Sequence, residues 1–209
     1  MEKIKSIIDK DIVKIEVPYF NFLNEHKRGF IEVHKSVKDE VELIFKELES
    51  IKFPIFSIKT IDNFNFSDED SVRGNNTSSY NFRFVAGTNK LSDHAIGLAI
   101  DINPLQNPWV HPSALNISDY NVHRKGTILE SGQVVEIFKK YGWSWGGYWK
   151  NPDYQHFFKG GDINKGIKNK LYSDSGVENP YLKTPTSRLS KLKILLKNLK
   201  YESTFLSCW

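Results

Sequence analysis

The chain has 209 residues, of which 39% are hydrophobic and 26% are charged, and its formal net charge is +4. This composition fits one globular domain, with or without a tail, and excludes the disordered and membrane-spanning classes. The charge surplus is too small to indicate nucleic-acid binding. The single cysteine, Cys208, excludes a disulfide framework and a cysteine-rich zinc module, so any metal site must use His, Asp or Glu.

Charges interrupt every short apolar run of the N-terminal sequence MEKIKSIIDKDIVKIEV. This pattern lacks the apolar core of a classical signal peptide. We therefore expect a protein that is synthesised in the cytoplasm. If it acts elsewhere, it must be released or exported by a non-classical route.

The first half of the chain is predicted to hold one clear helix followed by short extended segments. Apolar residues at helical spacing, with Lys and Glu between them, predict a helix over residues 33–50. Residues 53–66 indicate extended structure with a turn, and the polar, Gly- and Asn-rich residues 67–79 indicate a loop. Alternating side chains predict strands over residues 80–87 and 94–102.

The second half is predicted to mix a helix and a short strand with long loops. In order, we expect a Pro-rich loop at 103–113, a helix at 131–141, an aromatic Gly-rich loop at 142–153, a strand at 154–159, a connector at 160–187 and a basic amphipathic helix at 188–200. Helices that alternate irregularly with separate short strands predict an α+β fold.

Three residues stand out as metal ligands: His94, Asp101 and His156. Catalytic zinc commonly takes three protein ligands and leaves the fourth position for water. Two imidazoles and one carboxylate leave enough positive charge on the metal to lower the pKa of that water. A single histidine in a strand is more often structural than a ligand, so the hypothesis depends on the three residues meeting.

Geometry restricts how they can meet. A straight strand would separate His94 from Asp101 by roughly 23 Å, and ligand atoms lie about 2 Å from zinc. We therefore expect His94 on a bend before the strand and Asp101 on the strand itself, with Gly97 relieving the backbone between them. The strand at 154–159 is the natural source of His156.

Asp153 lies three residues before His156 and directly after Pro152. A carboxylate beside the metal could take a proton from the attacking water and deliver it to the leaving amine. The alternative is an ordinary turn residue after proline.

These residues resemble a known family. SDHAIGLAID, residues 92–101, is similar to the SxHxxGxAxD motif of the M15 metallopeptidases, and DYQHF, residues 153–157, to their DxxH motif. The loop GWSWGGYW before the second motif, and NNTSSYNFRFVAGT and INPLQNP around the first, also resemble family members. The resemblance covers about residues 30–160.

The family comprises D-alanyl-D-alanine carboxypeptidases and dipeptidases and L-alanyl-D-glutamate endopeptidases of bacteria and phages. The resemblance implies zinc held by His94, Asp101 and His156, with Asp153 as the catalytic base. It also implies that Arg83 steadies the scissile carbonyl and its developing oxyanion; without the family, a surface salt bridge would be the simpler interpretation. It implies a small central antiparallel sheet with flanking helices, as in DD-peptidases and Hedgehog signalling domains.

Three further residues are candidates for substrate binding. Ser92 is a candidate for a hydrogen bond within the site. Trp145 and Tyr148 belong to an aromatic run that could form a cleft wall along a peptide stem. Core packing is the alternative for about half of that run.

Together these observations predict a zinc peptidase domain over residues 1–164 and a connector with a basic tail over residues 165–209. The resemblance implies that the reaction is hydrolysis of peptidoglycan stem peptides in the cell wall, of the D-Ala-D-Ala carboxypeptidase type. The alternatives are L-Ala-D-Glu endopeptidase activity, as in an endolysin or exported lytic effector, and a zinc-stabilised binding module without catalysis. The tail predicts contact with anionic surfaces, and no nucleic-acid partner is expected.

Overall fold

A computed structural model describes residues 2–85, 87–111 and 119–182. The chain forms two compact units, residues 1–177 and residues 178–209, and the elements below all lie in the first. The helix predicted at 188–200, and with it the expected anionic contact, lies outside the described residues. None of the described helices is long and apolar enough to cross a membrane.

The N-terminal part of the chain forms a helix and a long hairpin that the sequence patterns did not predict. Helix α1 spans Glu2–Ile8, and strands β1 (Ile12–Phe20) and β2 (His26–His34) pair antiparallel along their whole length. Charged side chains of β1 face outward while Ile15 and Val17 are buried. Lys14 and Glu16, two of the charges that interrupt the apolar runs, are thus on the exposed face of an alternating strand.

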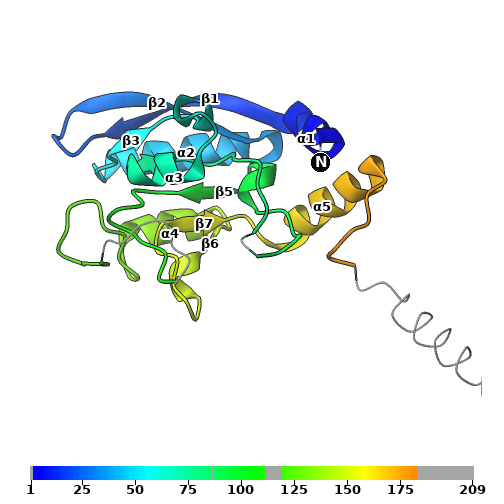
Figure 1. Cartoon of the computed structure of the whole chain (residues 1–209). Coiled ribbons are helices and arrows are strands. Elements are labelled where there is room, and N and C mark those ends of the chain that lie inside the picture. Colours follow the sequence, from blue (N-terminus) through cyan, green and yellow to red (C-terminus); the bar gives the residue numbers. More distant parts are fainter. Residues whose placement is uncertain (1, 86, 112–118, 183–209) are drawn as a thin grey trace, which may run out of the picture. The chain divides into compact units, whose positions relative to one another are not determined.

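Helix α2, Lys38–Ser50, confirms the helix predicted over residues 33–50. The first residues of the predicted range belong instead to β2 and to a short 3₁₀ turn, Lys35–Val37. Figure 1 shows α2 beneath the hairpin, where it packs on β1. The predicted loop at 67–79 is wrong in part, because helix α3 spans Asp68–Arg73 within it. The Ser67 hydroxyl caps that helix by accepting from the Asp70 amide at 3.1 Å.

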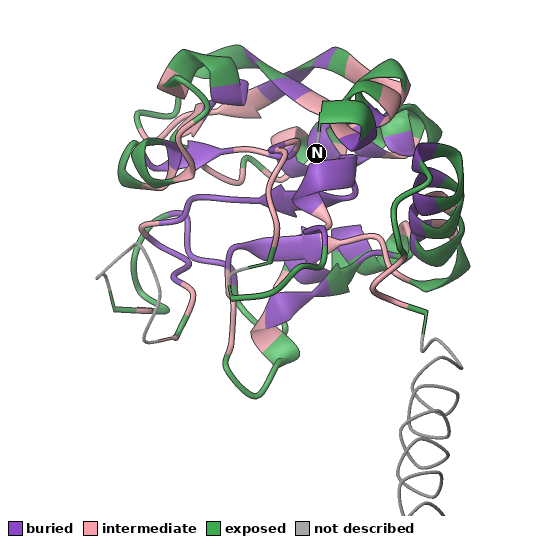
Figure 2. Cartoon of the chain, turned by 45° about the vertical axis from the view of Figure 1, so that its right-hand side comes forward, coloured by how far each residue is buried: buried purple, intermediate pink, exposed green. Residues whose placement is uncertain are grey.

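The centre of the fold is a small antiparallel sheet of three short strands. Its order is β5 (Ala99–Asp101), β7 (His156–Phe158) and β6 (Ser144–Trp145). Strands β5 and β7 confirm two predicted strands, and Figure 2 shows buried segments running through this region. Helix α4, Gln133–Lys140, confirms another prediction and covers the sheet by stacking Phe138 on Phe157, with ring centroids 3.8 Å apart.

Backbone hydrogen bonds join this sheet to the N-terminal hairpin. Ser78 and Asp101 exchange two bonds of 3.0 and 2.9 Å, and the Tyr80 amide donates to the Glu32 carbonyl. The predicted strand at 80–87 is absent from the described part of this segment, which makes only a bridge between Phe84 and Leu91. Two very short strands, β3 (Ser57–Ile58) and β4 (Asn76–Thr77), pair in parallel nearby.

The connector predicted from residue 160 is wrong over its first half. Helix α5 spans Gly161–Ser175, crosses the predicted domain boundary at residue 164, and packs on α1. Its polar sequence weakens the helical pattern, because the buried face itself includes Asn164, Lys168 and Ser175. Tertiary contacts therefore stabilise a helix that periodicity alone does not reveal.

Gly97 connects the segment that contains His94 to β2, because its carbonyl accepts from the His34 amide at 3.0 Å. Its φ is +65°, and an added Cβ would lie 2.4 Å from the His34 amide nitrogen. We expect Gly97→Ala to destabilise the fold by about 3 kcal/mol, because both the backbone strain and the clash must be absorbed. Urea unfolding measures the loss.

The matched control is Gly166→Ala in α5, where an added Cβ meets nothing within 4 Å. It should stabilise the protein by about 1 kcal/mol through helix propensity. Equal unfolding midpoints for the two variants would contradict the constraint at Gly97.

Candidate metal centre and active site

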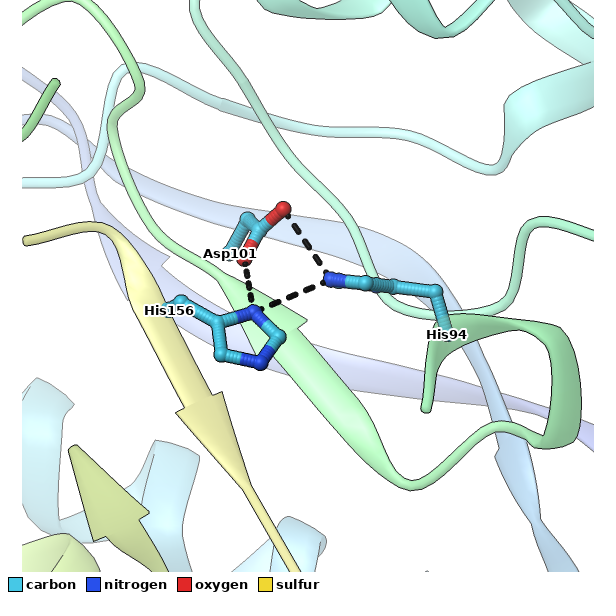
Figure 3. A group of neighbouring side chains, drawn as sticks. All are labelled: His94, Asp101 and His156. Carbon is cyan, nitrogen blue, oxygen red and sulfur yellow. Dashed lines mark hydrogen bonds and ion pairs between the residues drawn. The ribbon is translucent and has the colours of Figure 1, made fainter. Parts of the chain in front are cut away.

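His94, Asp101 and His156 meet in one buried group (Figure 3). His94 Nε2 lies 3.1 Å from Asp101 Oδ2 and 3.2 Å from His156 Nδ1. His156 Nδ1 lies 2.9 Å from Asp101 Oδ1. One ligand atom from each residue therefore points to a common centre.

The local fold explains this meeting. His94 begins a 3₁₀ turn, His94–Ile96, and Gly97 ends it in the left-handed region before β5 starts at Ala99. The predicted bend before the strand is confirmed. On the other side, β5 and β7 pair in a register that sets Asp101 opposite His156, so both side chains project from the same face of the sheet.

The donor set fits a divalent metal. Two ligand atoms at tetrahedral positions around zinc, each 2.0–2.1 Å from it, lie about 3.3 Å apart, close to the separations observed here. His94 Nδ1 lies 2.7 Å from the Ser79 carbonyl. That contact makes Nδ1 the donor, so that with a metal bound the Nε2 nitrogen would present its lone pair to the centre, as in metal sites whose second ring nitrogen is held by a carbonyl.

The electrostatics of the group are those of a carboxylate between two imidazoles. Burial raises the pKa of Asp101, but the charge of His94 and the hydrogen bonds from both histidines outweigh it and hold the pKa well below its usual range. Burial lowers the pKa of His156, but Asp101 outweighs it and raises that pKa. The site is thus an ionised acceptor buried in the core, which a cation would satisfy.

Asp153 lies at the edge of this group. Its amide donates to the Gly146 carbonyl at 3.1 Å, its carbonyl accepts from the His156 amide at 3.2 Å, and its backbone bridges to Trp109. Its buried Oδ1 has no hydrogen-bond partner among the described residues. Burial, followed by the charge of Asp101, raises the pKa of Asp153 to about 6. A carboxyl with that pKa exchanges protons readily near neutral pH, and a bound cation nearby would lower the pKa.

Gly146 explains part of the GWSWGGYW sequence. An added Cβ there would lie 2.8 Å from the Asp153 carbonyl oxygen and 3.2 Å from His156 Cβ. Glycine therefore permits the loop to approach the two residues closely. The Gly-Gly pair in the sequence indicated a close backbone approach, but only the fold shows that Gly146 approaches Asp153 and His156.

Arg83 is paired with Asp68. Its Nε lies 3.3 Å from Asp68 Oδ1, which also accepts from the Asn81 amide group at 2.9 Å. The Arg83 carbonyl accepts from the Ser92 amide, two residues before His94. Arg83 therefore belongs to the segment beside the ligand turn, but no contact links its side chain to the three ligand residues in the described structure.

The predicted substrate-binding residues lie in different settings. Ser92 is buried, and its Oγ accepts from the His94 amide at 3.3 Å, so its hydroxyl supports the ligand turn. Trp145 is only 3% exposed and donates from Nε1 to the Tyr154 carbonyl, which leaves little of its ring for a substrate. Tyr148 is exposed and reaches the Glu130 carbonyl and Lys139.

Trp149 belongs to the same aromatic run, Trp143, Trp145, Tyr148 and Trp149, but the sequence did not single it out as a substrate-binding candidate. Its ring centroid lies 5.3 Å from that of His156 and 5.5 Å from that of Phe158. The residue is 44% exposed. It thus presents an aromatic surface next to His156, and this ring contact distinguishes it from Tyr148, which is also exposed but whose ring packs on Trp145.

Comparisons with known proteins agree with this site. Residues 86–159 match the M15 peptidase family model described as D-alanyl-D-alanine carboxypeptidase. The matched segment holds His94, Asp101, Asp153 and His156, whereas Arg83 lies just before it. Comparisons with curated proteins and with solved structures return no match. Through the segment that carries its buried His-Asp-His group, the chain is thus similar to the M15 family of peptidases, and this match supports an M15 peptidase.

Proposed function

We propose that the protein is a zinc peptidase that hydrolyses peptidoglycan stem peptides, with removal of a terminal D-alanine as its reaction. The observation that carries the proposal is the buried His94, Asp101 and His156 group with the unpartnered Oδ1 of Asp153 at its edge, on a segment that matches carboxypeptidases. The proposal includes the core arrangement shared by DD-peptidases and Hedgehog domains.

The metal and the carboxylate have separate tasks in this proposal. His94, Asp101 and His156 would hold the zinc, which would supply a Lewis acid for the scissile carbonyl and would lower the pKa of the attacking water. Asp153 takes the proton of that water and gives it to the leaving amine. Its backbone bonds to Gly146 and His156 hold the carboxylate beside the ligand strand.

Arg83 is the proposed partner of the developing oxyanion. Asp68 engages its Nε, and the other guanidinium nitrogens are donors that a substrate oxygen could accept from. A cation held in this way stabilises charge that forms during the reaction. Trp149, rather than the buried Trp145, is the proposed aromatic contact with the peptide stem, since its exposed ring lies beside that of His156.

Two alternatives remain testable. An L-Ala-D-Glu endopeptidase would use the same metal and base on an internal bond. A zinc-stabilised binding module would need the ligands but neither Asp153 nor Arg83. A half-buried carboxylate with an unpartnered oxygen has no evident use in a pure binder, because burying it costs free energy.

Digestion of purified muropeptides, followed by mass analysis, tests the proposal. We expect zinc-dependent loss of one terminal alanine, and an all-L peptide of the same composition should be a poor substrate. Splitting of the stem between alanine and glutamate would support the endopeptidase instead. Peptide binding without any product, under conditions where zinc is bound, would support the binding module.

A further inference from the structure

Helix α5 reaches the turn that carries His94. Lys168 Nζ lies 2.6 Å from Asp93 Oδ1, and Asn164 Nδ2 lies 2.9 Å from the same oxygen. Asp93 directly precedes His94 in the chain. Both α5 side chains are buried, and that of Lys168 is only 10% exposed. Two polar groups of one helix thus converge on a single carboxylate next to a ligand residue.

Asp93 transmits this contact to the turn through its backbone. Its carbonyl accepts from the Ile96 amide at 3.3 Å and from the Leu98 amide at 3.0 Å. These two bonds close the turn in which His94 stands. The carboxylate of Asp93 is therefore held by α5, while its carbonyl holds the turn.

Asn164 also reaches the segment that follows the other histidine. Its Nδ2 lies 3.1 Å from the Lys159 carbonyl, and the Lys159 amide donates to the Leu98 carbonyl at 2.8 Å. Lys159 comes directly after β7, which begins with His156. One amide group thus connects the residue before His94 with the end of the His156 strand.

We propose that Lys168 and Asn164 are positioning residues that hold the two histidine-bearing segments at the spacing a metal requires. The inference rests on the proposed metal site and adds a part of the chain to it, since α5 lies beyond the residues 86–159 that match the family. Residues that orient metal ligands without touching the metal commonly contribute 10–100-fold to metal affinity.

The charge of Lys168 and its positioning role should change the metal affinity in opposite directions, so the sign of the change in Lys168→Met distinguishes them. In Lys168→Met, the Asp93 carboxylate loses its cation, and by charge alone it would attract a nearby metal ion more strongly. Loss of positioning would instead weaken binding. A lower metal affinity in Lys168→Met would therefore indicate that Lys168 acts by positioning the turn.

The experiment measures zinc and cobalt affinity by competition with a chromophoric chelator on the full chain. We expect about tenfold weaker binding in Lys168→Met and in Asn164→Ala, with a changed visible spectrum of the bound cobalt. The matched control is Lys165→Met, which removes the same charge from an exposed position of α5 and should bind as the wild type does. Should Lys168→Met fail to fold, Asn164→Ala still tests the inference, because it retains the ion pair.

A double-mutant cycle shows whether Lys168 acts through Asp93. In the Asp93→Asn background, Lys168→Met should change the zinc affinity much less than it does alone. Unchanged or tighter binding in both single α5 variants, or an effect of Lys168→Met that persists fully in that background, would overturn the inference. If the wild type binds no metal, the proposed function fails and this inference fails with it; if the wild type binds metal and the α5 variants bind equally well, the inference alone fails.

Discussion

His156→Ala is expected to abolish stoichiometric metal binding. The wild type should carry about one zinc per chain, since three buried ligand atoms converge on one centre. Removing His156 takes away one ligand and the partner of Asp101 Oδ1. We expect the affinity to fall more than about a hundredfold, beyond the effect of losing an outer-shell contact. Elemental analysis and competition with a chelator measure both quantities.

A control variant shows whether the loss of zinc is specific to His156 or follows from removing a histidine elsewhere. His123→Ala removes an exposed imidazole and should keep the full zinc content. The thermal midpoint should rise with added zinc in the wild type and in this control, but not in His156→Ala, because a ligand stabilises only the state that binds it. Full zinc occupancy in His156→Ala would show that the ligand set is wrong.

Asp153→Asn is expected to keep the metal and lose the reaction. Asparagine preserves the shape of the side chain but cannot take a proton, so turnover of the stem peptide should fall on the order of 100-fold or more. The zinc content should stay at the wild-type level, since Asp153 is not among the three grouped ligands. Parallel measurement of zinc content and kcat distinguishes a base from a ligand.

Asp162→Asn is the matched control, because Asp162 is an exposed carboxylate at the start of α5. It should leave turnover and zinc content unchanged. Normal turnover in Asp153→Asn would remove Asp153 from the mechanism, and loss of zinc in that variant would assign it a structural role at the metal.

Much of the candidate metal centre follows from local sequence. The interval between His94 and Asp101 is too long for a straight strand to bring both to one ion, and Gly97 is the residue in that interval that adopts the left-handed conformation easily. Those two facts predict the bend, and the structure has it. The strand at His156 was also predictable from local sequence, because a short apolar run bounded by turn residues is typical of a buried strand.

The N-terminal hairpin and α3 show where local patterns mislead. In β1, charged side chains alternate with buried apolar ones. In the sequence the charges interrupt an apolar run, but in the structure they occupy the exposed face of one strand. In α3, the capping serine and three acidic residues were present, but a six-residue helix is too short to show a hydrophobic period. Both elements are stable only because neighbouring elements cover them.

By itself, the sequence determined which three residues would meet as a candidate metal group, the bend before β5 and the similarity to the M15 peptidases, because a motif records residue types and spacing along the chain. Only the tertiary structure decided which aromatic ring stands exposed beside His156, that Arg83 forms an ion pair with Asp68, and that α5 holds Asp93. Trp145 and Trp149 are the same residue type four positions apart, and packing buries one and exposes the other. Lys168 and Asp93 are 75 residues apart, and no local pattern records a contact over that distance, because it arises when separate elements pack together.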